Sequence, residues 1–170
     1  MDGRETPREK TCCFTGHRSA KLPGGANEND PRCLRLKADL ADAVEAVYEG
    51  GVRHFICGMA EGCDIFFGEA VAALRRSRPD VTLEAAVPCP EQDLRWSAGS
   101  TERYDRLLSE CDKLTVVSPR YSPECMMRRN RYMVDRSGVV IAVFNGSRGG
   151  TFNTLRYAVR CGLEIIEIDP

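Results

Sequence analysis

Three glycine-containing segments carry the residues whose types and spacing suit chemistry on a negatively charged ligand. The first is Thr15-Gly16-His17-Arg18, in which glycine allows a ligand close to the backbone and His17 and Arg18 can donate to a phosphate or a carbonyl oxygen. A tight turn with two solvated side chains is the competing interpretation. The third segment, Gly149-Gly150-Thr151, places two glycines and a hydroxyl at the start of a predicted helix. Amides, helix dipole and hydroxyl would converge there on a phosphate, or Thr151 would simply cap the helix.

The second segment reads Gly58-Met59-Ala60-Glu61-Gly62-Cys63-Asp64 and lies between a predicted strand and a predicted helix. Its glycines permit a tight turn with exposed amides, and Asp64 would either accept a hydrogen bond from a ribose hydroxyl or cap its own helix. The spacing differs from the G-x-G-x-x-G dinucleotide fingerprint. We expect ligand contacts from five of its residues, namely Gly58, Met59, Ala60, Gly62 and Asp64.

The sequence holds no recognisable catalytic set, so the catalytic residues are left unassigned. It has no G-x-S-x-G, no H-E-x-x-H and no Walker A lysine. An enzyme that cleaves an N-glycosidic or phosphoribosyl bond is the first alternative, with Glu61 or Asp64 as its carboxylate. Single-stranded nucleic-acid binding is the second, through the arginines between Arg128 and Arg136 (Arg128, Arg129, Arg131 and Arg136), although such a cluster more often forms a solvated helix face.

Composition indicates one globular domain over residues 1–170, with residues 1–10 as a short polar tail. A formal net charge of -1 does not favour nucleic acid as a partner, and no apolar stretch is long enough to span a membrane. The nine cysteines include no C-x-x-C pair and only two histidines accompany them, which argues against disulfides and zinc. Reduced cysteines and a polar amino terminus are typical of a cytoplasmic protein.

Six short apolar runs alternate with helical patterns and predict the elements that must position the three segments. The expected strands cover 11–15, 52–57, 81–87, 113–118, 139–144 and 163–168. Alternation without hairpin dipeptides predicts a three-layer α/β/α Rossmann-like domain with a mostly parallel sheet. Ligands bind such sheets beyond the carboxyl ends of the strands, where all three segments fall.

Four stretches in this order resemble the YpsA-like branch of the SLOG superfamily: CCFTGHR, ICGMAEGCD, RYMVDRSGVVIAVFNG, and GGT followed by YAVRCGLEIIEID. The superfamily includes DprA and the Lonely Guy phosphoribohydrolases, and the resemblance implies a Rossmann-like fold, a nucleotide-derived ligand and a homodimer. Gly58, Ala60, Gly62 and Asp64 resemble the S-G-x-A-x-G-I-D loop of DprA. Gly149, Gly150 and Thr151 resemble the superfamily's phosphate loop.

One departure bears on the reaction. Lonely Guy enzymes read P-G-G-x-G-T-x-x-E, whereas this chain has no residue between its glycines and Thr151 and carries Thr154 at the position of the glutamate. Their hydrolytic mechanism is therefore not carried over. The sequence predicts a protein that binds or senses a small nucleotide-like ligand of unspecified identity, with no metal and no further cofactor.

Overall fold

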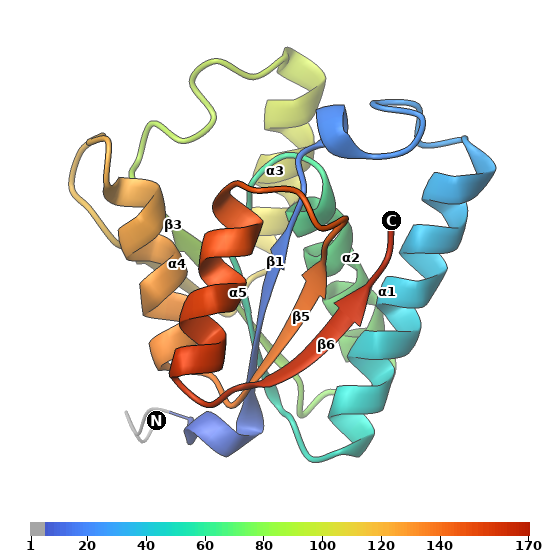
Figure 1. Cartoon of the computed structure of the whole chain (residues 1–170), viewed down its shortest axis with the longest axis vertical. Helices are drawn as coiled ribbons and strands as arrows, with labels where there is room; N and C mark the ends of the chain where they lie inside the picture. Colours follow the sequence, from blue (N-terminus) through green and yellow to red (C-terminus); the bar gives the residue numbers. More distant parts are fainter. Residues whose placement is uncertain (1–5) are drawn as a thin grey trace.

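A computed structural model describes residues 6–170, which form one six-stranded sheet covered by helices on both faces (Figure 1). The strand order is β4-β3-β2-β1-β5-β6 and every neighbouring pair is parallel. The strands are β1 (Thr11–Gly16), β2 (His54–Cys57), β3 (Thr82–Val87), β4 (Lys113–Val116), β5 (Val139–Val143) and β6 (Glu164–Ile168). The predicted three-layer Rossmann-like fold is confirmed, and the sheet is parallel throughout.

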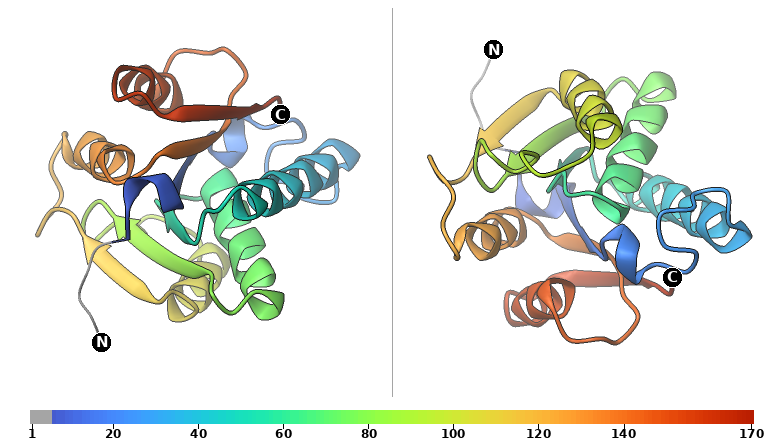
Figure 2. Two further views of the ribbon diagram at one scale, coloured as in Figure 1. Left: turned by 90° about the horizontal axis from the view of Figure 1, so that it is seen from below. Right: turned by 90° about the horizontal axis from the view of Figure 1, so that it is seen from above.

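Five α-helices divide between the two faces of the sheet (Figure 2). One face packs against α1 (Pro31–Glu49), α2 (Cys63–Ser77) and α3 (Ala98–Ser109), and the other against α4 (Cys125–Asp135) and α5 (Gly150–Arg160). Successive strand residues supply the two cores in turn: Cys12 and Phe14 join the first, and Cys13 joins the second. This double covering explains why the strands read as continuous apolar runs.

The direction of chain winding reverses beside β1. From β1 the chain adds β2, β3 and β4 outward on one side, and then returns through α4 to place β5 on the other side of β1. The helices that follow β1 and β5 therefore cover opposite faces, and the strand ends between them open a crevice. The segments after β1 and β5 are two of the three glycine-containing segments.

The amino-terminal residues differ from the expected tail. Arg8–Lys10 form a single 3₁₀ turn (η1), and the Arg8 guanidinium donates from Nε and Nη2 to the Ser137 carbonyl oxygen, both at 3.2 Å. Residues 1–5 of the predicted tail lie outside the described residues. The Arg8 side chain fixes the turn by donating hydrogen bonds to the Ser137 carbonyl oxygen, just beyond the end of α4.

All nine cysteines are free thiols, seven of them buried and two half-buried. Within residues 6–170 no cluster of three or more potential metal ligands occurs, and no helix has both the length and the apolar character that crossing a bilayer requires. The cysteines therefore act mainly as small core residues.

Candidate phosphate-binding site

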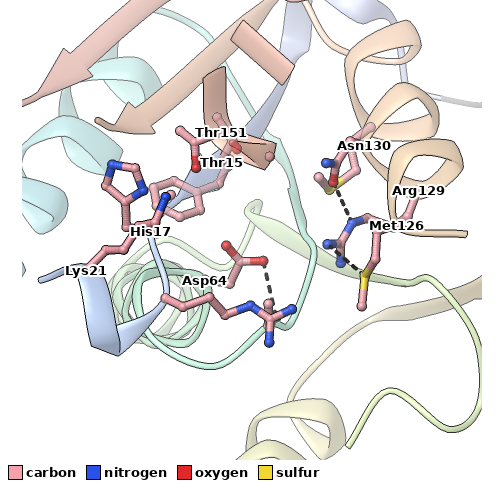
Figure 3. A pocket seen from close by; sticks show the side chains of 14 residues that line it. Thr15, His17, Lys21, Asp64, Met126, Arg129, Asn130 and Thr151 are labelled. Atoms are coloured by element: carbon pink, nitrogen blue, oxygen red, sulfur yellow. Dashed lines mark hydrogen bonds between the residues drawn. The ribbon is translucent and has the colours of Figure 1, made fainter. Parts of the chain in front are cut away.

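A cavity of about 270 Å³ lies at the switch point, between the ends of the central strands, one side of α4 and the amino-terminal end of α5 (Figure 3). The structure brings all three predicted segments together at this cavity. The predicted residues that line it are Gly16, His17, Arg18, Ala60, Asp64, Gly150 and Thr151. Four other predicted residues belong to the same loops but do not line the cavity, namely Gly58, Met59, Gly62 and Gly149.

The amino-terminal end of α5 opens into the cavity without a side-chain cap. Gly149 is the N-cap residue, and the first hydrogen bond within the helix runs from Asn153 N to Gly149 O at 3.0 Å. Thr151 is the second residue of the helix, so the interpretation of its side chain as an ordinary cap is wrong. The first amides of α5 are left available to an anion, which the helix dipole also favours.

Two residues with hydroxyl side chains face this opening. Thr15 is 7% exposed and Thr151 is 6% exposed, and both line the cavity (Figure 3). Within residues 6–170 neither hydroxyl has a hydrogen-bond partner, and both oxygens stay accessible from the cavity. A ligand with acceptor oxygens would satisfy both.

His17 and Lys21 complete this side of the site. His17 Nε2 accepts a hydrogen bond from the Asn145 amide at 3.2 Å, so Nδ1 carries the proton of the neutral ring. Burial lowers the pKa of His17, with Lys21 adding to the effect, so the neutral form prevails at pH 7. Lys21 Nζ donates to the Arg148 carbonyl oxygen at 3.4 Å and lies in the cavity wall. The site thus offers a neutral imidazole donor and an ammonium cation.

Asp64 and Arg129 face each other across Gly58. A Cβ atom at Gly58 would lie 2.5 Å from Arg129 Nη1 and 2.7 Å from Asp64 Oδ2, so only glycine fits. Arg129 is 5% exposed, and its Nη1 donates to the Gly58 and Ala86 carbonyl oxygens. Burial raises the pKa of Asp64, while the nearby charge of Arg129 opposes the rise. The two groups form a buried pair of opposite charge in the cavity wall.

The second segment is less open to a ligand than its sequence suggests. Asp64 Oδ2 accepts from the Ala60 amide at 3.2 Å, and Cys63 N donates to the His17 carbonyl oxygen at 3.2 Å. Asp64 therefore closes its own loop rather than capping α2, whose N-cap is Gly62. The Ala60 and Cys63 amides are thus already engaged, and the loop presents a carboxylate to the cavity.

Gly62 joins the loops after β1 and β2. Its φ of +90° is a left-handed conformation, and a Cβ atom there would lie 2.7 Å from Ser19 N and 2.9 Å from the His17 carbonyl oxygen. We expect Gly62→Ala to destabilise the protein by about 1–3 kcal/mol, measured by urea unfolding, because strain and overlap add. Gly99→Ala, in α3 where a Cβ meets nothing within 4 Å, should be neutral or slightly stabilising. Equal stabilities of the two variants would contradict this.

A strained residue and a buried amide hold the floor of the second segment. Met59 is fully buried and has a φ of +60°, a conformation that costs a non-glycine residue free energy. Gln92 Nε2 donates to the Met59 carbonyl oxygen at 2.6 Å and to that of Gly58 at 3.3 Å. Gln92 lies between β3 and α3, so that connection fixes the shape of the loop.

Seven residues that line the cavity were not among the predicted ligand contacts: Phe14, Thr15, Lys21, Met126, Arg129, Asn130 and Met133. Lys21 follows the first segment closely, and a search for cations around predicted phosphate loops would have found it. Arg129 was placed in a solvated cluster, and that interpretation is wrong for this residue. Arg128 and Arg131 are exposed as expected.

Fold and site together define the chain as a Rossmann-like domain with a candidate anion site at its switch point. The YpsA family model, described as YspA SLOG family, matches residues 12–160. The chain therefore belongs to the YpsA family of SLOG proteins, as the sequence resemblance indicates. Among curated relatives, the uncharacterized SPbeta prophage-derived protein YoqJ of Bacillus subtilis strain 168 is 33% identical, over 76% of this chain and 83% of YoqJ. A UPF0398 protein of Bacillus pumilus is 24% identical, over 84% of this chain and 77% of that protein.

Two solved structures of DNA processing protein A (DprA) share the fold. The Streptococcus pneumoniae protein aligns with a TM-score of 0.63 and 16% identity, over 94% of this chain and 50% of that one. The Helicobacter pylori protein, whose structure is described for its single-stranded DNA binding mode, aligns with a TM-score of 0.64 and 16% identity, over 96% of this chain and 66% of that one. This chain thus spans only half of one DprA chain and about two thirds of the other. At such identities the likeness shows the fold alone.

Proposed function

We propose that the protein binds a nucleotide or nucleotide derivative in the cavity at the switch point and acts as a binding or sensing module. A phosphate would sit at the amino-terminal end of α5, held by its free amides, Thr151 and Lys21. The ribose would lie toward Asp64, whose carboxylate can accept hydrogen bonds from sugar hydroxyls. No bond needs to be broken for this function.

One observation carries the proposal: the uncapped end of α5 meets two cavity-lining hydroxyls that no other residue of the range 6–170 engages, in a cavity that also holds Lys21, Arg18 and His17. Amides, hydroxyls and cations are all donors or positive groups, and their natural complement is a phosphate. Asp64 is the single carboxylate in the cavity wall, which fits a sugar hydroxyl rather than a second phosphate.

Nucleotide titration by calorimetry and thermal unfolding tests the proposal. A nucleotide present at a hundredfold over its Kd should stabilise the protein by about 2.7 kcal/mol. Thr151→Val, which removes one hydroxyl at similar volume, should weaken binding by about tenfold to a hundredfold, since a hydrogen bond to a charged acceptor is worth about 1.5–3 kcal/mol. Thr101→Val, in α3 on the opposite face, should bind normally. Absence of stabilisation by any nucleoside mono-, di- or triphosphate would refute the proposal.

Hydrolysis of an N-glycosidic bond is a second candidate function, because a buried carboxyl group with a raised pKa in a ligand cavity is typical of an acid–base catalyst. Asp64 is the residue in that position, and Glu61 does not line the cavity. Incubation with nucleoside monophosphates and chromatography for free base tests it. Release of base that Asp64→Asn abolishes would support hydrolysis. Binding without release would leave the sensing function alone.

A homodimer stays a prediction from the resemblance, and light scattering after size exclusion will test it. Single-stranded nucleic acid is the other macromolecular partner to consider, because the DprA structures include one described for single-stranded DNA binding. The near-neutral net charge argues against nucleic acid as a partner, but a protein of this net charge can still carry a local basic surface. Its test is combined with the experiment below.

A further inference from the structure

A second depression adjoins the phosphate cavity on the outer side of α4 and α5. It is a groove of about 550 Å³ between the two helices, and Met126, Asn130 and Gly150 line both it and the cavity. In Figure 3 Met126 and Asn130 form the wall of the cavity opposite Thr15 and Thr151. The cavity and the groove are therefore direct neighbours, with Met126, Asn130 and Gly150 at their shared boundary.

The groove is positively charged. Arg131 on α4 and Arg156 and Arg160 on α5 line it, and its wall contains no carboxylate. All three arginines are exposed, and none forms an ion pair with another residue of the described range 6–170. Guanidinium groups bind phosphates and carboxylates through bidentate hydrogen bonds, so three of them around one groove without a carboxylate favour an anionic occupant.

The groove also offers apolar surface, and aromatic rings hold two of its arginines. Pro123, Met126, Met127 and the Tyr157 ring form apolar parts of the wall, and Met127 is 51% exposed. The Arg131 guanidinium lies 5.4 Å from the centre of the Tyr157 ring, and that of Arg156 lies 5.7 Å from the centre of the Phe152 ring. Such stacking limits the freedom of the guanidinium groups before a ligand arrives.

We infer that this groove is a second subsite that takes the distal half of the ligand, a second phosphate with a planar base, so that the protein prefers a dinucleotide to a mononucleotide. The inference rests on the proposed function, since the first phosphate occupies the end of α5. Arg156 and Arg160 lie one turn apart on that same helix, so the two positive charges extend along α5 from its amino-terminal end toward its carboxyl-terminal end. The methionine surface accepts a flat base because thioether side chains adapt their shape.

The test compares ligands of matched base and different length by calorimetry. The probes are AMP, GMP, CMP and UMP and the 5′-phosphorylated dinucleotides pApA, pGpG, pCpC and pUpU. The best dinucleotide should bind at least about tenfold tighter than its mononucleotide. Arg156→Gln/Arg160→Gln should remove most of this difference and change the mononucleotide Kd less than about threefold, because both side chains lie outside the first cavity. Arg35→Gln/Arg106→Gln, exposed on α1 and α3 with the same change in charge, should keep the difference.

The outcomes separate the two proposals. Mononucleotide binding without a dinucleotide advantage, or an advantage that survives in Arg156→Gln/Arg160→Gln, overturns the groove inference and leaves the proposed function intact. Binding of neither length overturns both. A twelve-residue oligonucleotide distinguishes nucleic acid: affinity that keeps rising beyond two nucleotides, with a salt slope of about -0.7 per phosphate, would overturn the dinucleotide inference in favour of a single-stranded nucleic-acid track.

Discussion

Replacing Gly150 by aspartate is expected to weaken nucleotide binding by about a hundredfold or more without lowering the stability of the protein. A Cβ atom at Gly150 meets nothing within 4 Å, and its φ is not one that requires glycine. An acidic side chain in the first turn of a helix also stabilises that helix, by about 0.3–1 kcal/mol. The same carboxylate would occupy the phosphate position and repel the ligand by several kcal/mol at an effective dielectric constant of about 20.

Gly150→Ala is the matched control, because it adds the Cβ atom without the charge. It should bind within about threefold of the wild type, and both variants should unfold at or slightly above the wild-type urea midpoint. Calorimetry with the best nucleotide from the screen gives the affinities. Wild-type affinity in Gly150→Asp would mean that the end of α5 does not hold the phosphate, and an equal loss in Gly150→Ala would indicate a backbone effect.

Arg129→Met should destabilise the protein by about 3–5 kcal/mol, the largest stability effect we expect for a residue of the site. The substitution keeps an apolar stem of similar length but removes the buried cation whose charge lowers the pKa of Asp64. It also leaves the Gly58 and Ala86 carbonyl oxygens without this donor. An unpaired buried charge accounts for most of that cost.

The loss should depend on pH in a way that identifies Asp64. Burial raises the pKa of Asp64 above its ordinary value of 3.8, so the folded protein binds its proton more tightly than the unfolded chain. Stability therefore falls as pH rises from about 4 through the folded-state pKa. Without Arg129 this pKa rises further, so the destabilisation should be smaller at pH 4 than at pH 7. Asp64→Asn combined with Arg129→Met should remove the difference, and a loss that is constant with pH would contradict the assignment.

The elements of the fold follow from local patterns, and their order in the sheet does not. Each strand is a short apolar run bounded by glycine, proline or polar residues, so all six were predicted, although β4 ends at Val116 rather than at residue 118. The apolar runs do not indicate that β5 lies beside β1, because the order of the strands depends on how α4 and α5 pack on the second face of the sheet. Only the general rule for parallel sheets placed the three segments at one edge.

Residues of the candidate site could be predicted where their place at the end of a strand or the start of a helix puts them at the cavity. They could not be predicted where burial against the sheet decides which side chain lines it. Gly150 and Thr151 lie at the start of a helix after a strand, which the sequence shows. Arg129 differs from its neighbour Arg128 by one step of about 100° around α4, and only the position of the sheet decides that one is buried and the other exposed. Gly62 was assigned to the ligand, yet the structure uses it for contact between loops.

The hydrogen bonds from Gln92 to the Gly58 and Met59 carbonyl oxygens let residues outside the cavity wall influence its shape. Met59 holds a conformation worth about 1–3 kcal/mol of strain, and the amide that restrains it comes from a connection that does not line the cavity. Substitutions in residues 88–97 would therefore alter the shape of the loop over residues 58–64, beside which we propose that the sugar lies, while every side chain that lines the cavity stayed the same. Members of one family could diverge in what they recognise through this remote support.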